Sequence, residues 1–170
     1  MDLPNRKPNR LKGWNYNNGA SYYVTVCTHQ KQNTLSLICR DSPCGCPHIK
    51  LTDLGEIVQN VIYRVENKYS DFVVFDNYVI MPNHLHLIVS IKNEADERTA
   101  ARAVPTLSKL IGEIKSCAAV DWIRHCKSNS IDIAPVWQRS YYDHVIRCQQ
   151  DYEEIWRYID ENPYKRIRDF

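Results

Sequence analysis

The sequence predicts an α+β fold in which helices pack on an antiparallel β-sheet. Residues 21–28, 72–80 and 84–91 are rich in β-branched and aromatic side chains, which is typical of strands. Residues 52–68 and 107–122 instead repeat apolar side chains at helical spacing. The expected order is strand, helix, two paired strands, helix, strand and one extra helix. This order favours a ferredoxin-like or RRM-like sheet with helices on one face.

The first half of the chain begins with a polar, basic arm over residues 1–19. After the strand at 21–28, residues 34–39 and 48–51 are predicted to pair as a hairpin. Thr52 is expected to cap the first helix, which ends near Lys68. The apolar face of that helix consists of Leu54, Ile57, Val58, Val61, Ile62 and Val65.

The second half is expected to hold one long helix, one strand and a terminal helix. Pro105-Thr106 begins the long helix, and residues 136–147 contain a turn and a fourth core strand. The terminal helix is predicted from about Gln150 to Glu161, with Asn162-Pro163 as its stop. The remaining segments are a charged connector at 92–103, a polar loop at 127–135 and a basic tail at 164–170.

Composition indicates an ordinary globular protein with one domain over residues 1–170. Apolar residues make up 44% and charged residues 25%, and no apolar run is long enough to span a bilayer. The N-terminus lacks a secretion signal, so a cytoplasmic location is expected. The formal net charge is only +2, but basic residues cluster at both ends as solvated tails or phosphate contacts. These residues are Arg6, Lys7, Arg10, Lys12, Lys165, Arg166 and Arg168.

The cysteines favour a reduced protein. There are seven, an odd number, in a chain without a secretion signal, which argues against a disulfide framework. Cys39, Cys44, Cys46 and His48 are spaced closely enough to suggest a zinc site, but they lack paired C-x2-C units. Prolines and a glycine between them instead favour a tight turn with incidental thiols.

His84 and His86 lie two residues apart on a predicted strand. Side chains at i and i+2 share one strand face, so both imidazoles are expected to project together, opposite Leu85 and Leu87. Two neutral imidazoles form half of a divalent-metal site, which then needs oxygen ligands from elsewhere. The alternative is two polar residues on a half-buried strand.

Tyr158 and Asn162 lie one helical turn apart on the predicted terminal helix. Tyr152, Ile155 and Ile159 mark the buried side of that helix, and Tyr158 flanks them. A phenol and a carboxamide at i and i+4 can face one active site together. A tyrosine beside an apolar stripe is more commonly a packing residue.

Three blocks of the chain, in this order, resemble the REP-associated tyrosine transposases. They are residues 78–89 with the two histidines, 136–147 with Trp137-Gln138-Arg139, and 157–163 with Tyr158, Asn162 and Pro163. The resemblance extends from about Ala20 to Arg166. These proteins are domesticated relatives of the single-tyrosine HUH transposases. Their fold agrees with the α+β outline, with the tyrosine on a C-terminal helix.

The resemblance implies a role for each matching residue. His84 and His86 match the two histidines that hold Mg²⁺ or Mn²⁺, and Tyr158 matches the nucleophilic tyrosine. Asn162 occupies the place of a third polar metal ligand, which is often Gln in relatives. The implied activity is cleavage of single-stranded, hairpin-forming repeat DNA through a 5′-phosphotyrosine link. The implied partners are this DNA and, in some relatives, a second subunit.

The block at 136–147 adds candidate DNA contacts. Trp137, Tyr141 and Tyr142 offer stacking surfaces for unpaired bases, or they are core or dimer packing residues. Arg139 suits a phosphate contact, and His144 is either a proton relay or a hydrogen-bonded structural histidine. Two other functions remain open: a nucleic-acid-binding module without catalysis, and a small metal-binding protein that uses the cysteine tract.

Overall fold

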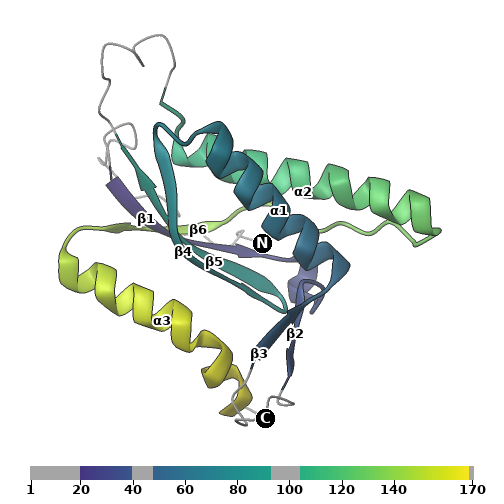
Figure 1. Ribbon diagram of the computed structural model, residues 1–170. Helices are drawn as coiled ribbons and strands as arrows, with labels where there is room; N and C mark the ends of the chain where they lie inside the picture. The colour runs from purple at the N-terminus through teal and green to yellow at the C-terminus, as the bar shows by residue number, and fades with distance from the viewer. Residues whose placement is uncertain (1–19, 40–47, 93–103, 169–170) are drawn as a thin grey trace, which may run out of the picture.

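The computed structural model describes residues 20–39, 48–92 and 104–168, with side chains through Lys165 (Figure 1). The predicted arm at 1–19, the tip at 40–47 and most of the connector at 92–103 lie outside these ranges. The described elements, in chain order, are β1 (Ala20–Cys27), η1 (His29–Lys31), β2 (Ser36–Cys39), β3 (His48–Leu51), α1 (Asp53–Lys68), β4 (Val73–Met81), β5 (His84–Ile91), α2 (Leu107–Asn129), β6 (Tyr142–Ile146) and α3 (Gln149–Arg168).

The main sheet is antiparallel and has the strand order β4-β5-β1-β6, so the predicted α+β fold is confirmed. In β1 and β5, Val24 pairs with Leu87, Thr25 with His86 and Cys27 with His84. The predicted hairpin is also present, because β2 pairs with β3 as a separate two-stranded sheet. The central position of β1 and β5 explains why their apolar runs are the most completely buried of the strands.

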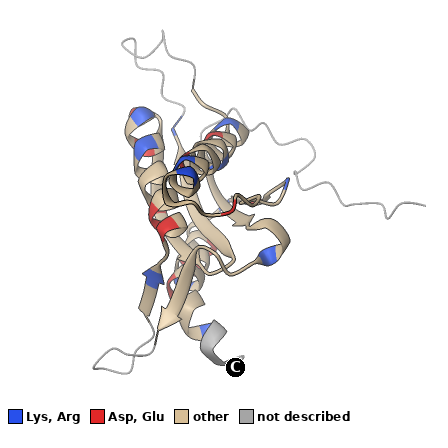
Figure 2. Ribbon diagram, turned by 90° about the vertical axis from the view of Figure 1, so that its right-hand side faces the viewer, with Lys and Arg blue, Asp and Glu red and all other residues tan. Residues whose placement is uncertain are grey.

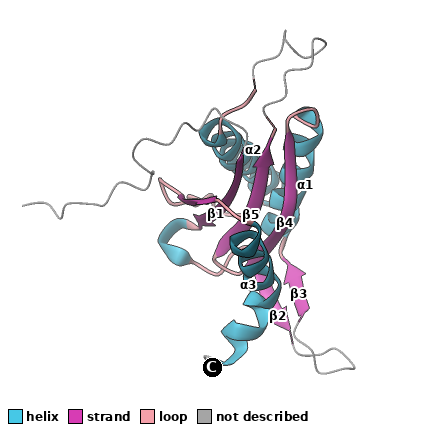
Figure 3. Cartoon of the chain, turned by 90° about the vertical axis from the view of Figure 1, so that its left-hand side faces the viewer, coloured by secondary structure: helices cyan, strands magenta, loops and turns pink. Residues whose placement is uncertain are grey.

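Helices cover both faces of the main sheet (Figures 1 and 3). α1 and α2 pack on one face, and α3 lies across the other, a placement that the sequence left open. The core between the sheet and the first two helices is apolar and almost inaccessible to solvent. It includes Tyr22, Val24, Val26, Leu85, Leu87, Val89, Val58, Val61, Ile62, Leu110, Ile111 and Ile114.

Helices α1 and α2 each begin at a threonine cap. The side chain of Thr52 accepts a hydrogen bond from Gly55 N at 3.2 Å, and that of Thr106 accepts one from Lys109 N at 3.3 Å. Ion pairs between α1 and α2 join Arg64 to Asp121 and Lys68 to Glu113. Figure 2 shows that both basic and acidic residues occur on these helices.

The predicted end of the last helix is wrong. α3 continues through Pro163 to Arg168 instead of stopping at Asn162-Pro163. A proline inside a helix removes one backbone hydrogen bond and strains the preceding turn. Asn162 and Pro163 are both buried, so their packing offsets that local cost. The first five residues of the predicted basic tail therefore belong to the helix that carries Tyr158.

Alanine substitution of two helical glycines is expected to change the free energy of unfolding in opposite directions. A Cβ on Gly55 would lie 2.0 Å from the backbone oxygen of Leu35, whereas a Cβ on Gly112 would meet nothing within 4 Å. We expect Gly55→Ala to lower the free energy of unfolding by about 1–3 kcal/mol, because the backbone must shift. We expect Gly112→Ala to raise it by about 0.5–1 kcal/mol through helix propensity. Urea denaturation of both variants tests this, and equal effects would contradict it.

Candidate active site

The two histidines of β5 project from the sheet face that α3 covers. His84 and His86 alternate with Leu85 and Leu87, which are fully buried in the core on the other face. The two imidazole rings have centroids 4.5 Å apart. His84 and His86 therefore share one strand face, as predicted, and their rings are close enough to bind one ligand together.

His86 is held by two hydroxyl groups from the neighbouring strand β1. Its Nδ1 lies 2.8 Å from Tyr23 Oη and 2.9 Å from Thr25 Oγ1, and the Tyr23 ring stacks on it at 5.3 Å between centroids. Burial lowers the pKa of His86 to about 3, and the neighbouring His84 adds to the shift. His86 is therefore a neutral imidazole at physiological pH.

His84 is oriented by its chain neighbour. Its Nδ1 lies 2.7 Å from Asn83 Oδ1, and the amide nitrogen of Asn83 donates to the carbonyl of Lys31 at 3.3 Å. Because an amide oxygen only accepts, this arrangement puts the ring proton of His84 on Nδ1. Its Nε2 then carries the lone pair.

Tyr158 reaches the histidines from α3. Its ring centroid lies 5.5 Å from that of His86 and 6.3 Å from that of Tyr23, and the side chain is 42% exposed. Lys165 Nζ lies 5.0 Å above the Tyr158 ring and pairs with Glu161 at 3.1 Å. The phenol therefore lies between buried His86 and solvent, with the ammonium group of Lys165 beside it.

The rest of the predicted site divides into three groups. Asn162, one turn beyond Tyr158, is buried at 8% exposure. Tyr142 and His144 share the sheet face of Thr25 and Tyr23, and His144 pairs with Asp151 at 3.0 Å, as expected of a structural histidine. Trp137 is half-buried and donates to the carbonyl of Lys115 at 3.1 Å.

Other predicted residues lie at the surface or outside the described chain. Arg139 and Lys165 are exposed. Cys39 pairs in register with His48 across the β2–β3 hairpin. The predicted residues that fall outside the described backbone or side chains are Arg6, Lys7, Arg10, Lys12, Cys44, Cys46 and Arg166.

The histidine pair has the properties of metal ligands. His86 Nε2 is buried and has no hydrogen-bond partner among the described residues, which is costly for a polar atom unless something else binds it. The two hydroxyl oxygens at its Nδ1 can accept the ring proton, which is what the outer partner of a metal-bound histidine does. Within the described residues, no cluster of three or more His, Cys, Asp or Glu side chains could hold an ion. Any further ligand that the described residues supply there would therefore be a neutral oxygen.

Sequence reasoning missed Tyr23 and Thr25. Both lie on the first strand at alternating positions, so it was predictable that their side chains share one strand face. Alternation alone does not say which residues of another strand that face will contact. Their contact with His86 depends on the register between β1 and β5, which pairs residues 57 to 71 positions apart. No local pattern encodes that register.

Some known proteins are similar to this chain in sequence or in fold. No protein-family model matches the chain. An uncharacterised protein of Haemophilus influenzae is 31% identical over 178 residues, which cover 95% of this chain and 89% of the relative. A candidate transposase of Deinococcus radiodurans is 12% identical over 89% of this chain and 95% of its own, with a TM-score of 0.47.

A solved structure of a REP-associated tyrosine transposase bound to a REP hairpin covers 98% of this chain and 74% of its own, with 21% identity and a TM-score of 0.57. No described helix is long and apolar enough to cross a membrane. The chain belongs to the family of the Haemophilus influenzae protein, and its fold is that of the REP-associated tyrosine transposase.

Proposed function

We propose that this protein is a metal-dependent endonuclease and strand transferase that cleaves single-stranded, hairpin-forming DNA. One observation carries the proposal: the exposed ring of Tyr158 lies beside the imidazole of His86, which is itself paired with that of His84 on one sheet surface. The fold likeness adds support, since the similar solved protein is bound to a REP hairpin. The assignments of the nucleophile and of the metal ligands rest on the geometry of this chain.

His84, His86 and Asn162 would hold the divalent cation, Mg²⁺ or Mn²⁺. His86 Nε2 is buried without a hydrogen-bond partner in the described part of the chain, which supports this assignment, as does the 4.5 Å separation of the two imidazole centroids. A bound cation would neutralise charge on the non-bridging oxygens of the scissile phosphate. Two imidazoles and one amide leave coordination positions for phosphate and water.

Tyr158 is the proposed nucleophile. Its Oη loses a proton and attacks the phosphorus, and the bond from phosphorus to O3′ breaks. The departing oxygen gains a proton as the free 3′-OH of the upstream fragment, while the downstream fragment stays on Tyr158 through its 5′ phosphate as a phosphotyrosine. The new phosphodiester allows a later 3′-OH to reverse the step and join strands. Lys165, beside the phenol, adds positive charge where the phosphate would approach.

Covalent capture of DNA tests the proposal. The purified protein, incubated with Mn²⁺ and a 3′-end-labelled hairpin with single-stranded flanks, should form a denaturation-resistant adduct that carries the fragment downstream of the cut. Chelator should prevent the adduct. The alternative is a non-catalytic nucleic-acid-binding module. It is supported if no adduct forms and the protein binds the hairpin with an affinity that depends on salt but does not change with chelator.

The hydroxyls of β1 are expected to tune metal affinity. Tyr23→Phe combined with Thr25→Val removes both partners of His86 Nδ1 while keeping the shapes of the side chains. We expect the dissociation constant for Mn²⁺ to rise roughly 10- to 100-fold, because the His86 ring loses its fixed tautomer. Titration calorimetry measures this, with Tyr63→Phe on exposed α1 surface as the matched control. Unchanged affinity in the double variant would contradict the role of the hydroxyls.

A further inference from the structure

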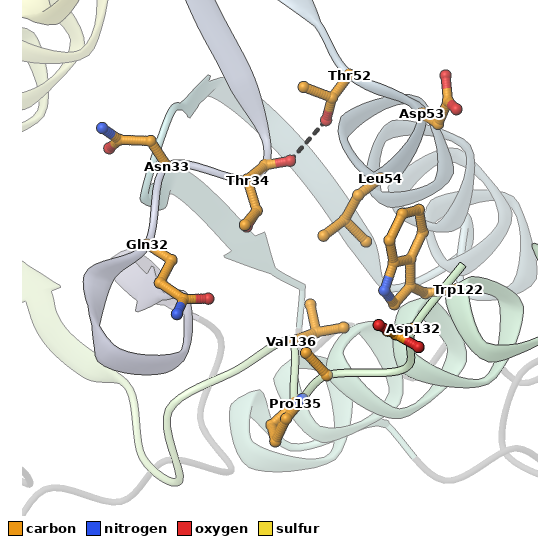
Figure 4. Close-up of a pocket in the computed structure, with 11 residues that line it drawn as sticks. Gln32, Asn33, Thr34, Thr52, Asp53, Leu54, Trp122, Asp132, Pro135 and Val136 are labelled. Carbon is orange, nitrogen blue, oxygen red and sulfur yellow. Dashed lines mark hydrogen bonds between the residues drawn. The ribbon is translucent and has the colours of Figure 1, made fainter. Parts of the chain in front are cut away.

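A cavity of about 440 Å³ lies apart from the histidines, between the start of α1, the second half of α2 and the loop before β6 (Figure 4). Its apolar lining includes Leu54, Trp122 and Val136. Figure 4 shows the Trp122 ring and the Asp132 carboxylate on one side of the cavity and Gln32 on the other. The cavity thus combines one aromatic wall with polar groups that can contact the edge of a planar ring.

The aromatic wall is held in place from behind. Trp122 stacks on His125 with 5.2 Å between ring centroids and an interplanar angle of 11°. His125 Nε2 in turn lies 3.2 Å from Asp53 Oδ2, at the start of α1. A stacking surface that is already ordered loses little entropy when a second ring binds.

The charge of the lining selects the kind of ligand. Among the described residues that line the cavity, the charged ones are Asp53 and Asp132, and none is lysine or arginine. Phosphate and other anions are therefore disfavoured. A neutral ring that donates hydrogen bonds to Asp132 and Gln32 fits both the aromatic wall and the charge.

The cavity is connected to the candidate active site through the segment from Thr28 to Leu35. Thr28 N donates to Asn83 O and Leu35 N donates to Pro82 O, both at 3.0 Å, directly before His84 on β5. The same segment lines the cavity through Gln32. Lys31 is exposed on it and would offer a cation to a phosphate between the two sites.

We propose that the cavity binds one unstacked nucleobase of the DNA strand whose phosphate lies at Tyr158. The base is one with an exocyclic amino group, namely adenine, cytosine or guanine, because Asp132 accepts its hydrogen bond. Thymine lacks this group. The proposal rests on the proposed function, since it assigns the cavity to the same substrate. The cavity would thereby set where the strand is cut relative to its sequence.

An abasic-site scan of DNA binding tests this. The Tyr158→Phe protein, which keeps the cavity, is titrated with fluorescent hairpins that carry one abasic site at each position of the single-stranded flanks. We expect one position to weaken binding roughly tenfold or more, as the loss of one stacked base does. Adding Trp122→Leu should remove that penalty while leaving the other positions unchanged. The matched control is Trp156→Leu on α3, a partly exposed tryptophan that should keep the penalty.

Asp132→Asn is the second variant, because Asp132 is exposed and its replacement should not disturb folding. At the sensitive position we expect wild-type Asp132 to disfavour thymine several-fold, and Asp132→Asn to reduce this preference. The cavity proposal is wrong, and the proposed function stands, if the wild-type protein forms the adduct but no abasic penalty depends on Trp122. The same holds if the discrimination against thymine is unchanged in Asp132→Asn. If no DNA binds, the proposed function fails with it.

Discussion

Tyr158→Phe is expected to abolish the covalent protein–DNA adduct, reducing it to the background of a reaction without metal. The substitution removes one oxygen, the proposed attacking atom, and leaves the ring in place. Because Tyr158 is 42% exposed, we expect the free energy of unfolding to change by less than about 0.5 kcal/mol. Denaturing gels of the labelled hairpin reaction, together with urea denaturation, measure both effects.

Two controls make the Tyr158 result specific. Tyr164→Phe changes another exposed tyrosine of α3, at 47% exposure, and should leave the adduct intact. Tyr23 also lies near the histidines, and burial raises the pKa of its phenol to about 12, so it is a poor source of phenolate. Mass spectrometry of adduct peptides should therefore find the nucleotide on Tyr158. A nucleotide on Tyr23 would refute the assignment of the nucleophile.

His84→Ala and His86→Ala are expected to abolish stabilisation by Mn²⁺. A ligand present at 100 times its dissociation constant stabilises the native state by about 2.7 kcal/mol. For a domain of this size that raises the melting temperature by roughly 5–10 °C. Thermal denaturation with Mn²⁺ and with chelator should show this shift in the wild type and not in either variant. His84 is the safer replacement, because the loss of buried His86 also leaves the Tyr23 and Thr25 hydroxyls without their partner.

His48→Ala is the matched control and decides between two metal sites. His48 is exposed on β3 and belongs to the cysteine tract, so its loss should leave the Mn²⁺ shift unchanged. A shift that survives His84→Ala but disappears in His48→Ala would assign the metal to the tract. The protein would then be a small metal-binding protein that uses the cysteine tract, one of the two alternatives that the sequence left open.

Local patterns predicted most of the fold. Alternation along residues 84–91 placed His84 and His86 on one face, and the helical spacing of apolar residues identified α1, with its cap Thr52, and α2. The loop predicted at 127–135 was wrong at its start, because α2 continues to Asn129. These features depend on neighbours within one turn or one strand, where backbone geometry sets which side chains face together. The end of α3 was mispredicted at Pro163, because burial of that turn offsets a local preference that sequence alone weighs fully.

The sequence by itself determined the two imidazoles on one strand face, and it placed a phenol and an amide one turn apart on the last helix. Only the tertiary structure decided that α3 crosses the histidine face, that Tyr158 comes within 5.5 Å of His86, and that two β1 hydroxyls reach its Nδ1. The physical reason is distance along the chain. Strand register and helix docking are set by the burial of side chains contributed by the whole core, and no segment read alone contains that information.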